Sequence, residues 1–447
     1  MGSTWIRNAQ IVNEGRKLFG SVTIKDEYLT EILEGDTTPS EPCTDIIDAQ
    51  GMFLIPGAID EHVHFRQPGF TYKGNIASES RAAAAGGVTS VMDMPNPNPQ
   101  TTTLETWGAK QELFAENSLV NYACYFGATN ENTHLFKCLD LHRTPGLKLF
   151  MGASTGNMLV DRRDALERIF KESPLLIAAH CEDQSVINAN LEIYSRRYLQ
   201  PNGDLPRWLH NHIRSEEACY RSTASAIELA TQTNARLHIL HLSTAKELTL
   251  FDNRPLQEKQ ITAEACIPHL LMSAKKLEKE YAFMSKCNPA IKTDTDKAML
   301  RQAVLDDTID AIATDHAPHT YDEKVGGSLK AASGIPSIQY GLPFMIQSFG
   351  FKTAVQKMCH APALLYQIRN RGFIRPGYKA DLVLVSKNAL SDYSKEPIYS
   401  KSRWSPFKHL PNYRVEMTFV NGHRVYERKS TKQPFDTTKH GQALCFR

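Results

Sequence analysis

The amino-acid sequence predicts an α/β fold, a (β/α)8 TIM barrel with a small β-sandwich domain formed from both chain termini. Three observations lead to this prediction. Short apolar runs alternate with longer amphipathic stretches in the middle of the chain, both ends contain short strand-like segments with turns, and polar residues follow almost every apolar run. Such alternation is typical of βα units. The 447 residues accommodate a barrel of about 250 residues and an accessory domain.

The predicted barrel strands are eight apolar runs of similar length. They are Phe53–Ile59, Val88–Met92, Asn121–Phe126, Gly146–Phe150, Leu175–Ala179, Arg236–Leu240, Ile261–Ile267 and Ala311–Ala313. Helical stretches lie between them. Ile76–Ala85 is rich in alanine, and Ser215 followed by two glutamates is typical of a helix start before Ala218–Thr231. This order of elements suits a closed parallel barrel.

The two ends of the chain have a strand pattern instead. Short alternating segments occur at Ser21–Ile24 and Leu29–Leu33, and again at Asp381–Val385 and Val415–Val420, where Asn421-Gly422 is a turn signal. We expect these strands to pair into one β-sandwich beside the barrel. The expected organisation is residues 1–55 for the first part of the sandwich, 56–371 for the barrel and 372–447 for the second part of the sandwich.

The charge and cysteine content favour a cytoplasmic protein that acts on a small molecule. Lys and Arg total 51 against 49 for Asp and Glu, a balance that indicates neither a nucleic-acid nor a membrane partner. Nine cysteines lack CxxC spacing, so we expect reduced thiols. Met1–Asn13 contains no apolar stretch of the signal-peptide kind, and no run approaches the length of a membrane span.

Polar residues of a few chemical types follow the apolar runs directly. The first run leads to Asp60-Glu61-His62-Val63-His64-Phe65-Arg66, the second to Met94-Pro95-Asn96, and the last to Asp315-His316-Ala317-Pro318-His319; the fourth contains Lys148, and the fifth and sixth are followed by His180 and His241. In a (β/α)8 barrel the carboxyl ends of the strands meet at one mouth, where the chemistry takes place. We therefore expect these side chains to share one site.

The imidazoles and one carboxylate point to a metal centre. Residues i and i+2 of a strand face the same side, so His62 and His64 can bind one ion, although such a pair alone is equally compatible with a polar strand end. His180, His241 and Asp315 at other strand ends are hard to explain by packing, because each buried polar group would need its own partner.

Lys148 is flanked by apolar residues, and a protonated lysine beside cations would be repelled. Its neutral amine can react with CO2 to form a carbamate that bridges two metals; the alternative is an ammonium that reaches solvent.

Three motifs together resemble class I dihydroorotases of the amidohydrolase superfamily, in the carboxylysine-bridged branch. They are Asp60-Glu61-His62-Val63-His64-Phe65-Arg66-Gln67-Pro68-Gly69, Met94-Pro95-Asn96-Pro97-Asn98-Pro99 and Asp315-His316-Ala317-Pro318-His319, and the similarity runs from about Leu54 to Asp381. The resemblance implies two divalent metal ions per chain, preferably Zn²⁺. His62 and His64 would hold one ion, His180 and His241 the other; Lys148, as a carbamate, would bridge them, and Asp315 would bind the first ion and act as the catalytic acid/base.

The resemblance also implies an anionic small-molecule substrate. Its carboxylate would be held by Arg66, Asn96 and His319 with His64 beside them, and its ring would contact Asn288, Ser333 and Gly334. The implied reaction is the reversible conversion between (S)-dihydroorotate and N-carbamoyl-L-aspartate in de novo pyrimidine biosynthesis. A metal-bridged hydroxide would attack the cyclic amide, and Asp315 would carry the proton to the departing nitrogen. Two parts of the sequence depart from the family pattern: Gln67 and the stretch Ala332-Ser333-Gly334-Ile335.

Other functions fit part of the pattern. Dihydropyrimidinases and allantoinases share the barrel and the metal pattern, but their substrates lack the ring carboxylate that Arg66 would bind. A catalytically silent scaffold is a further alternative, although such proteins usually lose metal ligands that are all present here. The superfamily also raises the option of a homodimer. The loop Thr320–Ile335, which contains Gly326-Gly327, is either a mobile lid or an ordinary surface loop.

Overall fold

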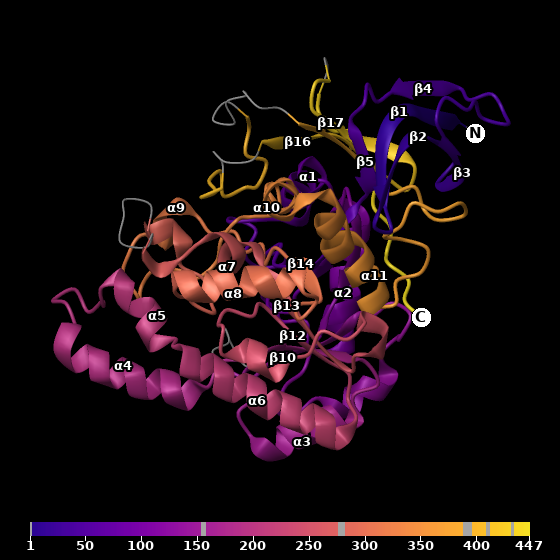
Figure 1. The fold of residues 1–447 in the computed structure, drawn as a ribbon. Coiled ribbons are helices and arrows are strands. Elements are labelled where there is room, and N and C mark those ends of the chain that lie inside the picture. Colours follow the sequence, from indigo (N-terminus) through magenta and orange to yellow (C-terminus); the bar gives the residue numbers. More distant parts are fainter. Residues whose placement is uncertain (1, 153–157, 276–281, 388–395, 408–411, 431–432) are drawn as a thin grey trace.

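The computed structural model describes residues 2–152, 158–275, 282–387, 396–407, 412–430 and 433–447. Its chain forms a barrel from the middle of the sequence and a separate sheet from the two ends, which lies at one side of the barrel (Figure 1). Within the described residues, no helix combines the length and apolar character that a membrane crossing requires.

The sheet beside the barrel takes strands from both ends of the chain. They are β1 (Ser3–Asn13), β2 (Arg16–Lys25), β3 (Tyr28–Glu34), β4 (Asp45–Asp48), β5 (Phe53–Pro56), β15 (Leu382–Lys387), β16 (Tyr413–Val420) and β17 (His423–Glu427). Their order is β17-β16-β15-β5-β1-β2-β3, and β4 pairs with β1. The antiparallel pair of β5 and β15 joins the two chain ends. The prediction that both termini build one β structure is confirmed, while the exact domain boundaries stay a prediction.

The sequence explains why these strands form and associate. Alternate apolar residues of both ends meet in one buried cluster, for example Ile6 and Val22 with Leu384 and Phe419. Fully burying one such side chain contributes about 1.5–3 kcal/mol. The turn Asn421-Gly422 has φ angles of 51° and 77°, the left-handed backbone that a tight hairpin turn of this type requires.

The barrel strands follow the predicted order. They are β6 (Ala58–Val63), β7 (Val88–Asp93), β8 (Asn121–Cys124), its continuation β9 (Phe126–Gly127), β10 (Gly146–Phe150), β11 (Leu176–His180), β12 (Leu237–Ile239), β13 (Ile261–Cys266) and β14 (Ala311–Ala313). Neighbouring strands are parallel. A parallel bridge between Val63 and His316 joins the last strand region to the first, so the barrel is closed as predicted.

Helices connect the strands and cover the barrel (Figure 1). They are α1 (Ile76–Ala85), α2 (Leu104–Asn117), α3 (Arg163–Glu172), α4 (Gln184–Tyr198), α5 (His210–Ile213), α6 (Glu216–Thr233), α7 (Ile267–Leu271), α8 (Asp294–Leu305), α9 (Tyr321–Lys324), α10 (Gly341–Val355) and α11 (Ala361–Leu365), with short helical turns η1 (Thr133–Cys138), η3 (Arg207–Leu209), η4 (Glu247–Leu250), η5 (Leu256–Glu258), η7 (Ala282–Ser285) and η8 (Gln356–His360). Helix α1 has the predicted bounds. Ser215 caps α6 by accepting a hydrogen bond from the Ala218 amide, as its position before two glutamates predicts.

The first predicted strand, Phe53–Ile59, is wrong as a single element. The chain changes sheets at Gly57, whose amide donates to Asp381, and the next amide, of Ala58, donates to Gly87. A Cβ atom at Gly57 would lie 2.1 Å from Thr89 Oγ1, so the close approach of the two strands requires glycine. The apolar run continues through the change because the residues on both sides of it are buried, which is why composition does not reveal the break.

Candidate active site at the mouth of the barrel

A cavity of about 570 Å³ lies at the carboxyl ends of the barrel strands. Every residue that the sequence placed in the site lines this one cavity: His62, His64, Arg66, Asn96, Lys148, His180, His241, Asn288, Asp315, His319, Ser333 and Gly334. Barrel closure brings these segments together from positions far apart in the chain. The structure places all of them at one mouth of the barrel, as expected. Their individual roles stay predictions.

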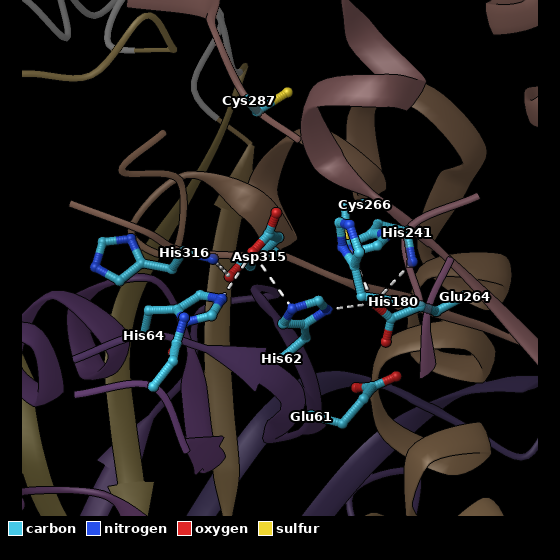
Figure 2. Close-up of polar contacts among 12 residues, drawn as sticks. Glu61, His62, His64, His180, His241, Glu264, Cys266, Cys287, Asp315 and His316 are labelled. Atoms are coloured by element: carbon cyan, nitrogen blue, oxygen red, sulfur yellow. Dashed lines mark hydrogen bonds and ion pairs between the residues drawn. The ribbon is translucent and has the colours of Figure 1, made fainter. Parts of the chain in front are cut away.

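The first group of side chains centres on Asp315. The Nε2 atoms of His62 and His64 lie 3.4 and 3.2 Å from Asp315 Oδ1. On the far side of the rings, His62 Nδ1 is 2.6 Å from Glu264 Oε1 and His64 Nδ1 is 2.8 Å from Asn96 Oδ1. Figure 2 shows His62 between Asp315 and Glu264. These outer partners orient both rings so that Nε2, the nitrogen that would bind a metal ion, faces Asp315.

The second group is formed by His180 and His241. His180 Nδ1 and His241 Nε2 are 2.9 Å apart. Burial lowers the pKa of both rings, so they are neutral near pH 7 and each has a lone pair to offer. His180 Nε2 lies 3.0 Å from Glu182 Oε2, and Glu182 also pairs with Arg214. His241 Nδ1 is buried and has no hydrogen-bond partner among the described residues.

Lys148 lies in the same cavity and is 1% exposed, so its amine does not reach solvent. Its Nζ is 4.5 Å from the centre of the Phe150 ring. Burial lowers the pKa of Lys148 to about 8, which makes the neutral amine far more available at neutral pH than in an ordinary lysine. The neutral amine is the form that reacts with CO2.

These side chains fit the metal ions that the family resemblance implies. One ring nitrogen each of His62 and His64 and an Asp315 oxygen lie within 4.8 Å of one another, as ligands of one ion do. Burial raises the pKa of Asp315, but the charges and hydrogen bond of His62 and His64 outweigh it and hold the pKa below the ordinary value. The donor set of imidazole nitrogens and a carboxylate oxygen suits Zn²⁺ and similar divalent ions.

A basic group lies next to the metal-ligand candidates. Arg66 Nε donates to the carbonyl oxygen of Pro318 at 3.1 Å, and Arg66 Nη2 is 3.1 Å from His319 Nε2. Burial, reinforced by the charge of Arg66, lowers the pKa of His319 to about 3, so this ring is neutral. Asn96 accepts from His64, and the donor that it can offer to a bound anion is its Nδ2 amide.

Each of the three predicted ring contacts has a partner of its own in the cavity. Asn288 Oδ1 is 3.1 Å from His210 Nε2, the Ser333 carbonyl oxygen is 3.1 Å from His319 Nε2, and the Gly334 amide donates to Lys286. The loop 320–335 is anchored as well. Buried Lys324 donates to three carbonyl oxygens, of Lys286, Ala332 and Gly334. Whether this loop opens as a lid stays a prediction.

Three cavity residues have a left-handed backbone. The φ angles are 69° at Arg66, 42° at His241 and 46° at Asp315. Such a backbone costs about 1–3 kcal/mol in a residue other than glycine and persists only where the surroundings hold it. All three follow the ends of barrel strands, and strain of this kind gathers at active sites.

Several residues of the site were not predicted from the sequence. Glu264, which holds His62, is the one charged residue in the apolar run Ile261–Ile267, and that isolation is a signal that the sequence does contain. Lys73, His210 and Arg214 line the cavity from loops and a short helix, where no strand pattern points to them.

A closed (β/α)8 barrel with inward-turned imidazoles, a lysine and a carboxylate at its carboxyl mouth is typical of the class of metal-dependent barrel hydrolases. Residues 53–425 match the amidohydrolase family. The chain belongs to this family, as its motifs predict.

Curated relatives agree with this family assignment, and solved structures agree with the fold. The chain is 32% identical over 392 residues to a dihydroorotase of Halobacterium salinarum, which covers 85% of this chain and 88% of the relative. It is 30% identical over 438 residues to a dihydroorotase of Lactobacillus johnsonii, and the match covers 95% of this chain and 99% of that relative. The L-hydantoinase (dihydropyrimidinase) from Arthrobacter aurescens superposes with a TM-score of 0.88 over 97% of this chain and 98% of its own. Because the two sequences are only 24% identical, this similarity supports the fold alone.

Proposed function

We propose that this protein is a dihydroorotase, which interconverts (S)-dihydroorotate and N-carbamoyl-L-aspartate in de novo pyrimidine biosynthesis. The observation that carries the proposal is one cavity in which the metal-ligand candidates lie beside Arg66 and His319. That arrangement suits a cyclic amide that bears a carboxylate. The similarity to curated dihydroorotases over most of the chain supports the same activity.

The metal ligands would be divided between the two groups described above. His62, His64 and Asp315 would hold one ion, His180 and His241 the second, and Lys148, as a carbamate, would bridge them. When bound, two divalent ions, for which we propose Zn²⁺, supply an acidified water and polarise the amide carbonyl of the substrate.

Asp315 would act as the proton carrier. Its pKa is held below the ordinary value by His62 and His64 against the effect of burial, so it begins hydrolysis as a carboxylate that can accept a proton. It then delivers this proton to the departing ring nitrogen. In the cyclising direction the same carboxyl begins protonated, so acidic conditions favour ring closure.

Arg66, Asn96 and His319 would bind the substrate carboxylate. The planar guanidinium of Arg66 matches the two oxygens of a carboxylate. Asn288 and the backbone at Ser333 and Gly334 would contact the ring. This positioning would hold the cyclic amide against the groups that carry out the reaction.

A turnover assay with dihydroorotate, N-carbamoyl-L-aspartate, dihydrouracil and allantoin tests the proposal. We expect turnover of the first two compounds and near two divalent ions per chain by elemental analysis. Faster turnover of dihydrouracil or allantoin would show a dihydropyrimidinase or an allantoinase instead. A chain that binds no metal and turns over none of the four would be the catalytically silent scaffold.

We further propose that the protein acts in the cytoplasm, because nine cysteines without regular spacing are typical of a reducing compartment. A homodimer is proposed from the family alone, and sedimentation of the purified protein tests it.

A further inference from the structure

Lys73 is a basic residue of the cavity that the mechanism above does not use. It lies in the loop between β6 and α1, and it is 8% exposed. Its Nζ is 3.2 Å from His319 Nδ1 and 3.0 Å from Glu323 Oε1. Lys73 thus contacts the carboxylate-binding histidine on the side of the ring that faces away from Arg66.

The partners of Lys73 define its protonation. Glu323 also accepts hydrogen bonds from the Tyr72 hydroxyl and the Thr320 amide, both at 2.9 Å. Burial raises the pKa of Glu323, but its contacts with His319, Thr320, Lys73 and Tyr72 outweigh it and lower the pKa well below the ordinary value. Glu323 is therefore a carboxylate, and the amine paired with it is an ammonium. An ammonium has three donors and no lone pair, so His319 Nδ1 has to be the acceptor.

The other ring nitrogen of His319 leads to the same assignment. Nε2 lies 3.1 Å from the Ser333 carbonyl oxygen, which can only accept. A neutral imidazole has one N–H, and the contacts with Lys73 and Ser333 favour Nε2. Nδ1 also lies 3.4 Å from Glu323 Oε2, a longer contact than the 3.2 Å to Lys73. The charged groups that act on the ring are Arg66, Lys73, Lys324 and Glu323, and three of these four are cations that oppose a second proton.

This tautomer creates a site for an anion. With its proton on Nε2, His319 has a donor, which the Ser333 carbonyl oxygen shares, 3.1 Å from the Nη2 donor of Arg66, and two donors cannot satisfy each other. One carboxylate can accept from both. With the proton on Nδ1, the Nε2 lone pair would instead accept from Arg66 and would repel a carboxylate.

We propose that Lys73 is a positioning residue that fixes His319 in the Nε2–H tautomer and so prepares the site for the substrate carboxylate. The identity of that carboxylate rests on the proposed function, but the tautomer does not. Lys73 therefore adds to carboxylate recognition through His319.

The direct test is ¹⁵N NMR of protein with labelled histidine rings, because protonated and bare ring nitrogens differ in chemical shift. A His319→Gln variant assigns the signals. We expect Nε2–H in the wild type and in Lys73→Arg, which keeps a donor, and a gain of Nδ1–H in Lys73→Met. The wild type with its proton on Nδ1, or an unchanged tautomer in Lys73→Met, would overturn the inference.

A matched control separates this effect from the loss of any buried lysine. Lys357 is 2% exposed, and its Nζ donates to Asp307 and to the Ile309 carbonyl oxygen. Both acceptors precede the first residue of β14, so Lys357 lies at the opposite end of the barrel from the cavity. Lys357→Met should leave the His319 signals unchanged even where it lowers thermal stability. Should Lys73→Met fail to fold, the wild-type tautomer and the Lys73→Arg spectrum still decide the inference.

Kinetics link the tautomer to recognition. Lys73→Met removes a buried charge-assisted hydrogen bond, so KM for dihydroorotate should rise roughly 10- to 100-fold, with a smaller change in kcat and recovery in Lys73→Arg. If the wild type does not turn over dihydroorotate, the proposed function fails while the NMR result stands. If the wild type does turn over dihydroorotate but Lys73→Met changes neither the His319 tautomer nor KM, the inference about Lys73 fails and the proposed function stands.

Discussion

The two groups of histidines in the cavity are held in different ways. His62 and His64 are fixed from outside by Glu264 and Asn96, at 2.6 and 2.8 Å, and face a carboxylate that belongs to their own group. His180 and His241 face each other at 2.9 Å instead. The outer nitrogen of His241 has no hydrogen-bond partner in the described part of the chain.

This difference shows which half of the site is prepared before an ion binds. In the Asp315 half, contacts with Glu264 and Asn96 orient the rings, so an ion meets ligands that are already in place. In the His180 half only the His180 ring has a polar partner outside the pair among the described residues, Glu182, and the two rings contact each other at 2.9 Å, so an ion has to separate that contact. We therefore expect the first ion to bind more tightly than the second.

The largest effect is expected from Asp315→Asn. The amide cannot accept the proton, and acid–base catalysis typically contributes about 10²- to 10⁴-fold, so turnover should fall by that factor in both directions. Steady-state kinetics with dihydroorotate and with N-carbamoyl-L-aspartate, together with metal analysis, measure it. Full turnover with both ions bound would rule out this role for Asp315.

A matched pair of glutamate variants tests the comparison itself. Glu264→Gln and Glu182→Gln each weaken the partner of one ligand, and loss of such a partner typically lowers metal affinity about 10- to 100-fold. Competition with a chelator should show that Glu264→Gln acts on the tightly bound ion and Glu182→Gln on the other. If either variant weakens both ions equally, the two halves are not independent.

The smallest effect is the acid sensitivity of the metal-free protein. Burial lowers the pKa of His64 to about 4 and that of His319 to about 3, whereas both titrate near 6.5 in the unfolded chain. The unfolded state therefore binds more protons as the pH falls below 6.5, and the folded state loses stability, by about 2 kcal/mol per histidine between pH 6.5 and 5. Asp315, with a lowered pKa, adds a loss only at pH values below its ordinary pKa.

Urea unfolding of chelator-treated protein at pH 7 and pH 5 measures this loss. His319→Gln removes one of the titrating rings and should reduce the difference between the two pH values. A stability that does not change between pH 7 and pH 5 would contradict the neutral, buried state of these histidines.

Much of the fold could be predicted because local pattern and tertiary role agree. The alanine-rich segment Ile76–Ala85 forms α1 with the predicted bounds, and Gly146–Phe150 is a barrel strand as predicted. The break at Gly57 was missed because an apolar run that is buried throughout does not show where a chain changes sheets.

The sequence by itself determined the residue types of the site and their order on the strands, since the identity of a side chain and its place at a strand end are local properties. Only the tertiary structure decided which partner each ring has. Glu264 holds His62 across 202 positions and Lys73 reaches His319 across 246. The left-handed backbones of Arg66, His241 and Asp315 were decided in the same way. A contact between distant segments depends on how the barrel closes, and no local pattern contains that information.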